Sequence, residues 1–163
     1  AEAITMLLKA GALIELPTAT GVTPLMAAAG MGHSFNPTRG RFKTDAQALE
    51  VVRLLKEAGG QVNVQSGNGT TALHAAAAHG WNETIKYLVA SGAALETRDG
   101  KGLAPIDHAA GKHEREFLEP EHPRRADTMA LLTEYIVAAT GRQPIEFAGT
   151  FNVAVKGTPG GAK

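Results

Sequence analysis

Six histidines are the residues of this chain that could coordinate a metal ion or transfer a proton. The positions that could form a ligand set are His108, His113, Glu116 and His122. They lack the H-E-x-x-H spacing or any comparable fixed spacing of metal ligands. The chain also has no cysteine and no G-x-S-x-G motif that would present a nucleophile. We therefore expect no metal site, no cofactor, no small-molecule substrate and no enzymatic activity.

Two glycine-rich segments, 67–69 and 100–102, superficially suggest phosphate-binding loops. Neither has the G-x-x-x-x-G-K-S/T spacing that cradles a phosphate at the start of a helix. Turns are the better interpretation, because two series of landmarks along the chain share the same intervals of 48 and 33 residues. The series are Gly11, Gly59 and Gly92, and Leu25, Leu73 and Ile106. These intervals indicate a 33-residue repeat with one insertion of 15 residues, so function must be sought on surfaces.

Three segments at the same point of this repeat have similar sequences. They are residues 21–28, 69–76 and 102–109. Their pattern resembles the ankyrin repeat, which has a 33-residue period and a T-P-L-H-x-A signature. Residues 71–76 lack only the proline, replaced by Ala72, whereas Ala104 and Asp107 replace the threonine and histidine of the third copy. The resemblance covers roughly residues 1–140 and implies an all-α solenoid, with His74 as a structural imidazole between repeats.

The residues of each copy predict the same local structure. A glycine-containing turn leads into a short helix that Thr23 or Thr71 is placed to cap, and alanine runs keep this helix thin. A second helix has apolar residues at i, i+3 and i+4 and ends at a glycine. In one repeat, residues 44–47 form a capping-box pattern that begins this second helix. A single repeat cannot bury its own apolar face, so each repeat depends on its neighbours.

The repeat pattern divides the chain into five segments. These are 1–17, the second helix and turn of a truncated repeat; 18–65, a repeat with an insertion at 34–48; 66–98, a repeat; 99–140, a C-terminal repeat with an insertion at 113–125; and 141–163, an extended, strand-like tail. The truncated repeat would expose Ile4, Leu7 and Leu8. We therefore expect further repeats before Ala1.

The tail has a different period from the repeats. Apolar residues, among them Ile145, Phe147 and Phe151, alternate with polar ones, which is strand spacing. An isolated strand needs a groove or an edge to lie on. We expect the tail to dock on the array itself or on a neighbouring subunit.

The two insertions distinguish this chain from a generic array. The first combines Phe35 and Phe42 with Arg39, Arg41 and Lys43, so it could bind an acidic protein or a nucleic-acid backbone. The alternative is a solvated loop that its two phenylalanines hold against the scaffold. The charges of the second insertion nearly cancel, which favours local ion pairs over a binding site.

The resemblance implies that partners contact the turn tips and the exposed positions of each first helix. The corresponding residues are Thr20, Val22, Met31, Asn68, Thr70, His79, Arg98, Lys101, Leu103 and Lys112. Trp81 is either an exposed hot spot or a wedge between helix ends, and both interpretations stay open at this stage. With Phe35, Arg39, Arg41, Phe42, Phe147 and Phe151, these residues form the predicted partner-binding set.

Composition limits the class of function. The sixteen basic residues balance the sixteen acidic ones, which argues against a general nucleic-acid or membrane-surface binder, and no apolar run is long enough to span a membrane. The alanine and glycine content and the long insertions suggest a bacterial ankyrin protein. The compartment stays open between the cytoplasm and export with loss of a leader.

We predict a non-enzymatic protein-interaction module, a structural or accessory subunit of a larger assembly whose partner is another protein or a neighbouring subunit. One alternative is the C-terminal targeting arm of a longer enzyme or electron-transfer protein. Another is a nucleic-acid binder that uses the basic loop.

Overall fold

The described chain is helical and has no strands. The computed structural model describes residues 2–32, 43–112 and 125–145. The helices are α1 (Glu2–Lys9), α2 (Pro24–Ala28), α3 (Asp45–Glu57), α4 (Ala72–His79), α5 (Asn82–Ala90), α6 (Pro105–Ala109) and α7 (Ala126–Thr140). The predicted all-α repeat architecture is therefore confirmed, while the strand predicted within 141–163 lies largely outside the described residues.

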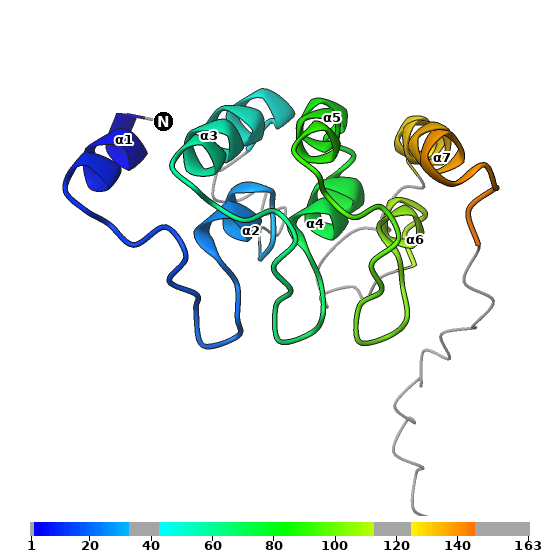
Figure 1. Ribbon diagram of the computed structural model, residues 1–163, viewed down its shortest axis with the longest axis horizontal. Coiled ribbons are helices and arrows are strands. Elements are labelled where there is room, and N and C mark those ends of the chain that lie inside the picture. The colour runs from blue at the N-terminus through cyan, green and yellow to red at the C-terminus, as the bar shows by residue number, and fades with distance from the viewer. Residues whose placement is uncertain (1, 33–42, 113–124, 146–163) are drawn as a thin grey trace, which may run out of the picture.

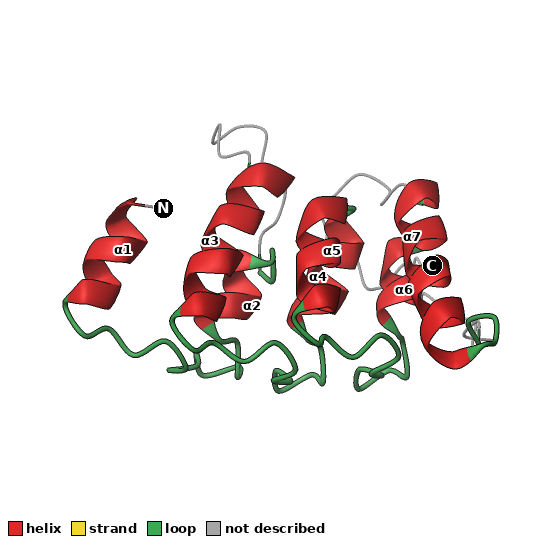
Figure 2. Cartoon of the chain, turned by 45° about the horizontal axis from the view of Figure 1, so that its top comes forward, coloured by secondary structure: helices red, strands yellow, loops and turns green. Residues whose placement is uncertain are grey.

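The helices form two parallel rows (Figure 1). The inner row consists of α2, α4 and α6, and the outer row consists of α1, α3, α5 and α7. Each inner helix packs against the outer helix that follows it in the chain, and α4 also packs between α2 and α6. The loops that join an outer helix to the next inner helix all project on the same side of the array (Figure 2). This arrangement is an open solenoid.

The predicted caps begin the helices. The hydroxyl of Thr23 accepts a hydrogen bond from the backbone N–H of Met26 at 3.4 Å, and Pro24 stands in the first turn of α2. The capping box predicted at Thr44 and Gln47 is confirmed, with hydrogen bonds of 3.1 and 3.3 Å between the backbone of each residue and the side chain of the other. Gly92, at φ +88°, reverses the chain after α5, which explains the glycine there.

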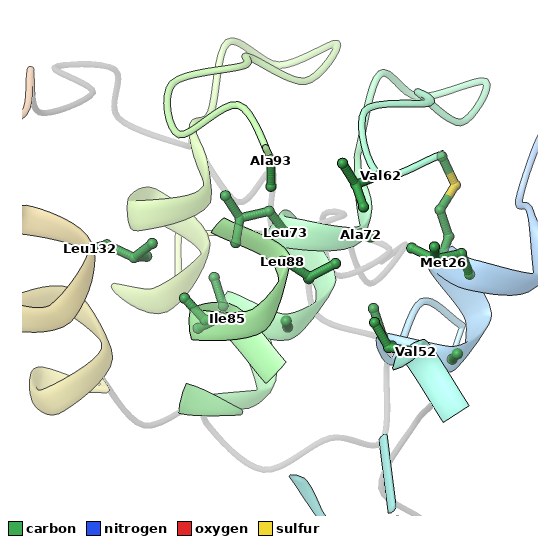
Figure 3. Packing of buried hydrophobic residues seen from close by; sticks show 14 of the residues in the cluster. Met26, Val52, Val62, Ala72, Leu73, Ile85, Leu88, Ala93 and Leu132 are labelled. Atoms are coloured by element: carbon green, nitrogen blue, oxygen red, sulfur yellow. The ribbon is translucent and has the colours of Figure 1, made fainter. Parts of the chain in front are cut away.

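The core is continuous from repeat to repeat (Figure 3). The landmark residues Leu25 and Leu73 are 0% and 1% exposed, and Ile106 is also buried. Alanines fill the space between adjacent inner helices, where Ala29, Ala76, Ala77 and Ala109 are completely buried. Their small side chains allow close packing of neighbouring helices, as the alanine runs predicted.

The outer helices are joined to one another by polar contacts. The carboxylate of Asp45 on α3 accepts hydrogen bonds from the backbone N–H groups of Glu83 and Thr84, at 2.8 and 3.0 Å, and from the Thr84 hydroxyl at 2.7 Å. The Asp45 side chain therefore caps α5 of the next repeat. A similar contact joins α5 to α7, because the Thr128 hydroxyl donates to Oδ1 of Asn82 at 2.6 Å.

The N-terminal helix is less completely covered than the others. Leu7 is 58% exposed, as predicted, whereas Ile4 and Leu8 are half-buried against the core. The predicted exposure of Ile4 and Leu8 is therefore only partly correct. Their burial against the core leaves Leu7 as the exposed member of the three.

Replacing Leu73 by alanine tests the contribution of the core. The substitution leaves a cavity between neighbouring repeats, so we expect the free energy of unfolding to fall by about 3 kcal/mol. Urea denaturation followed by circular dichroism measures this loss. The control is Leu16→Ala, because Leu16 is 65% exposed and its truncation should change stability by about 0.5 kcal/mol or less. Equal losses in the two variants would contradict the continuous core.

Candidate protein-interaction surface

Hydrogen bonds hold the turn tips in a row along one edge of the array. The backbone N–H of Gly67 donates to the carbonyl oxygen of Thr20 at 2.8 Å, and the N–H of Gly100 donates to the carbonyl of Asn68 at 2.7 Å. The tips can approach this closely because of glycine: a Cβ on Gly69, at φ +76°, would lie 3.0 Å from the backbone nitrogen of Gly100. The tip surface, defined by Thr20, Asn68, Arg98 and Lys101, is therefore preorganised.

The four residues of the tip surface are exposed, as predicted. The other predicted contacts on the described part of the chain are less accessible: Val22, Met31, Thr70, His79 and Lys112 are half-buried. Arg98 is fixed in place, since its guanidinium donates a 2.6 Å hydrogen bond to the carbonyl oxygen of Gly102. The structure therefore brings together a narrower surface than the sequence predicted, and its C-terminal end is basic.

The predicted exposure of Leu103 is wrong. This leucine is completely buried, because an apolar side chain at the start of the inner helix gains more from packing in the core than from facing water. Thr70 has the equivalent position in the preceding repeat, and its hydroxyl lies 2.6 Å from the hydroxyl of Ser66. Thr70 therefore remains half-buried at the turn, whereas the side chain of Leu103 packs in the core.

Trp81 is a wedge between helix ends, and the hot-spot interpretation is wrong. Its side chain is only 7% exposed. The indole stacks on the ring of His79, with centroids 4.5 Å apart and planes 20° from parallel, and Nε2 of His79 lies 3.0 Å from the carbonyl oxygen of Gly30. A Cβ on Gly30 would lie 2.7 Å from the indole. Trp81 and His79 thus close the contact between the ends of α2 and α4.

Two basic residues of the insertions, Lys43 and Arg125, bind the ends of inner helices, which sequence reasoning missed. Nζ of Lys43 donates to the carbonyl oxygens of Ala27 and Ala28 on α2 and lies 5.6 Å from the centroid of the Trp81 ring. Nε of Arg125 donates to the carbonyl of Ala78 on α4 at 3.0 Å. Cations at helix C-termini interact favourably with the helix dipole. Lys43, which the sequence left open between a partner-binding loop and a loop held against the scaffold, contacts the scaffold.

Burial lowers the pKa of both the Lys43 amine and the Arg125 guanidinium. A detectable signal existed in the sequence, because each of these residues is basic and shortly precedes a second helix. The repeat period does not indicate which carbonyl groups Lys43 and Arg125 bind. Lys43 and Arg125 thus attach the C-terminal parts of the two insertions to the ends of α2 and α4.

A pair of buried histidines links the last two repeats. The two rings of His74 and His108 meet edge to face, with centroids 4.9 Å apart. Nδ1 of His74 accepts a hydrogen bond from the backbone N–H of Thr71 at 3.0 Å, so Nε2 carries the proton and donates to the carbonyl of Leu103 at 3.1 Å. His108 Nε2 lies 2.9 Å from a carboxylate oxygen of Asp99. The structural imidazole implied for His74 is present.

Burial determines the protonation of this pair. Desolvation, reinforced by the neighbouring His108, lowers the pKa of His74 to about 4. Desolvation also lowers the pKa of His108, although Asp99 opposes the shift. Burial alone would raise the pKa of Asp99, but hydrogen bonds from His108 and from the backbone of Leu103 and Lys101 outweigh it, and the pKa is lowered. Near neutral pH the contact therefore consists of neutral imidazoles and an ionised carboxylate.

Several predicted site residues lie outside the described residues. They are Phe35, Arg39, Arg41, Phe42, Phe147 and Phe151. Within the described ranges, no group of three or more histidine and acidic side chains is arranged to hold a metal ion. None of the helices in these ranges combines the length and the apolar character needed to cross a membrane.

Comparison with known proteins agrees with this geometry. Residues 44–119 match the family model described as ankyrin repeats (3 copies). The chain is 33% identical over 91 residues to SH3 and multiple ankyrin repeat domains protein 2 of Homo sapiens. The aligned segment covers 56% of this chain and 4% of that protein. It is also 44% identical over 57 residues to Protein fem-1 homolog A-like of Mus musculus. This aligned segment covers 35% of the present chain and 9% of that protein.

The family match and the stacked helix pairs show that residues 44–119 consist of ankyrin repeats. Ankyrin repeats are in general protein-interaction modules. The chain spans less than a tenth of the length of these two relatives. Its bacterial character stays a prediction.

The buried histidines should make stability depend on pH. The pKa of His74 is about 4 in the folded chain and about 6.5 in an unfolded one. The contribution of neutral His74 to the free energy of unfolding is therefore complete above about pH 6.5. It declines by up to about 3 kcal/mol as the pH falls toward 4. Urea midpoints measured from pH 7.5 to 4.5 should therefore fall less steeply for His74→Gln than for the unmodified chain, with His79→Gln as the control. An NMR titration placing the His74 midpoint near 6.5 would contradict the assignment.

Proposed function

We propose that the chain is a non-enzymatic protein-binding subunit whose partner contacts the tip surface. The observation that carries the proposal is the pair of hydrogen bonds that fixes neighbouring tips, from Gly67 to Thr20 and from Gly100 to Asn68. A surface that is already ordered loses little conformational entropy when a partner binds. The extended row of tips suits a macromolecule better than a small ligand, because it presents projections instead of a closed cavity. As part of this proposal, the repeat boundaries are 18–65, 66–98 and 99–140.

Charge along the row suggests the chemistry of the partner. The tips are uncharged at Thr20 and Asn68 and basic at Arg98 and Lys101. We propose that the partner places polar side chains against the first two tips and an acidic group against the last. Exposed charges of this kind contribute more to specificity and to the rate of association than to affinity. The chain would then serve as a structural or accessory subunit that orients this partner in an assembly.

A matched pair of double variants tests the proposed surface. In the tip variant, Asn68→Arg with Lys101→Glu alters two exposed tips, and in the outer-helix variant, Ala90→Arg with Lys86→Glu makes the same net charge change on α5. Both variants should unfold at the same temperature as the unmodified chain, because exposed ion pairs such as that between Lys86 and Glu83 contribute little.

Quantitative mass spectrometry of proteins cross-linked to each chain in its native source provides the measurement. The partner should be recovered equally with the unmodified chain and the outer-helix variant, and at least about tenfold less with the tip variant, the loss expected when a few central contacts are removed. Equal recovery with both variants would exclude the tip surface. Elution of the native chain as a free monomer in size-exclusion chromatography would exclude the accessory-subunit role.

A further inference from the structure

A groove lies at the C-terminal end of the array, where α6, α7 and the chain that follows α7 meet (Figure 1). Its volume is about 330 Å³, and half of its eight lining residues are apolar. The apolar wall consists of Ile106, Ala110, Met129 and Pro144. The groove is therefore suited to a segment that has one apolar side and one polar side.

The outer wall of the groove aligns with a position that the preceding repeat buries. Thr84 of α5 and Thr128 of α7 are equivalent, because each hydroxyl donates to a side-chain oxygen of the first residue of the preceding outer helix, at 2.7 and 2.6 Å. This alignment pairs Met129 with Ile85. Ile85 is completely buried, whereas Met129 is only half-buried.

The inner wall shows the same difference at Ala110, which follows α6. The intervals of 33 and 48 residues align Ala110 with Ala77 of α4 and with Ala29 at the end of α2. Ala29 and Ala77 are completely buried, whereas Ala110 is half-buried. Both walls of the groove therefore retain apolar surface at positions that are fully covered in the preceding repeats.

The chain that leaves α7 is directed into this groove. Gly141, at φ +71°, ends α7 and reverses the chain. The guanidinium of Arg142 then donates to a carboxylate oxygen of Glu96 at 2.8 Å, which holds the reversed chain against the loop before α6. Pro144 follows in the wall of the groove, and the described part of the chain ends at the next residue.

The sequence that follows Pro144 has the apolar side that the groove requires. Ile145, Phe147 and Phe151 occupy alternate positions in the sequence, separated by polar or small residues. Successive side chains of an extended segment point to opposite sides, so these three share one side. Ile145 is 57% exposed, which places an uncovered apolar side chain directly beside the groove.

The charges of the groove and of this segment are complementary. The Lys112 side chain is 32% exposed, whereas its ion-pair partner Asp107 is 3% exposed, so the groove presents a positive charge to an approaching segment. Glu146 is the only charged residue in 145–155. It follows Pro144 by two residues, a distance of about 7 Å in an extended chain.

We propose that residues 145–151 lie extended across this groove of the same chain, with Phe147 and Phe151 against the apolar wall and Glu146 toward Lys112. The segment then covers α6 and α7 in place of a further repeat, because its period of two residues differs from the i, i+3, i+4 pattern of a helix. Its own chain is favoured over a second copy, because the link to Pro144 gives the segment a high effective concentration at the groove. Phe147 and Phe151 thus belong to the scaffold and not to the partner-binding surface.

A matched pair of double variants in the full chain tests the proposal. Phe147→Asp with Phe151→Asp adds two charges on the apolar side of the segment, whereas Thr150→Asp with Asn152→Asp adds the same charge on its polar side. The first variant should unfold about 5 °C below the unmodified chain, a shift of the size expected when two aromatic side chains lose part of their burial. The second should unfold within about 1 °C of the unmodified chain, as exposed substitutions usually do.

A spin label separates docking within one chain from docking between copies. The chain has no cysteine, so Ala154→Cys provides a single attachment site for a nitroxide. The label should broaden the methyl NMR signals of Ile106 and Met129, and this broadening should be lost when Phe147→Asp and Phe151→Asp are added. A mixture of spin-labelled chain with isotope-labelled chain that carries no nitroxide should show no broadening.

Two outcomes would overturn the proposal. One is that the two double variants unfold at the same temperature and that the aspartates at 147 and 151 leave the broadening unchanged, which would remove the segment from the groove. The other is broadening in the mixed sample, which would assign the groove to the tail of a second copy. The tip surface lies on the turns, so neither outcome decides whether a partner binds there.

Discussion

The close stacking of short inner helices is the interaction on which the rest of the structure depends. α2 and α6 have only five residues each, and helices this short are unstable in water on their own. They exist because alanines such as Ala29, Ala76 and Ala109, all completely buried, let one helix pack directly on the next. The same spacing brings neighbouring turns within hydrogen-bonding distance. The core and the tip surface are therefore two consequences of one packing distance.

Within the described ranges, the polar links between repeats join immediate neighbours. Asp45 reaches α5, Asn82 reaches α7, and the Thr20 carbonyl reaches Gly67. Such an array behaves as a one-dimensional chain of units, in which stability is a sum over units and over their interfaces. A partner that contacts several tips thus depends on several interfaces remaining intact. Loss of one interface would misplace the tips beyond it without changing any residue that touches the partner.

The parts of the structure that repeat could be predicted from the sequence. The shared intervals gave the helix pairs, and the capping box at Thr44 and Gln47 marked the start of α3. Exposure of Asn68 and Lys101 followed from their places at turn tips. Each of these properties is set by a residue and its near neighbours in the chain, which the repeat makes visible.

The contacts between repeats could not be predicted in the same way. The repeat pattern predicted an exposed Leu103 and left Trp81 open between an exposed and a wedged position, yet both side chains are buried against the adjoining helices. Lys43 and Arg125 bind carbonyl groups about 15 and 47 residues away in sequence. Their partners depend on how far apart two helix ends lie. That distance follows from the stacking and is not encoded in local spacing.

The signature position held by His74 shows how a single side chain can make one interface differ from the others. Nδ1 of His74 accepts a hydrogen bond from the backbone N–H of Thr71 in its own repeat, and Nε2 donates one to the carbonyl oxygen of Leu103 in the next, so His74 links two repeats. Met26 and Asp107 have the same position in the adjoining repeats. Asp107 also accepts from its own repeat, at the N–H of Ala104, but an ionised carboxylate has no proton to donate onward.

Among these three positions, only His74 can therefore form the donating link. It is placed beside His108, where burial already lowers the pKa of both rings. Protonation of His74 would remove the acceptor that Thr71 uses and add charge to a buried contact. Protonation of His74 would therefore weaken the interface between α4 and α6, which supports the basic end of the tip surface.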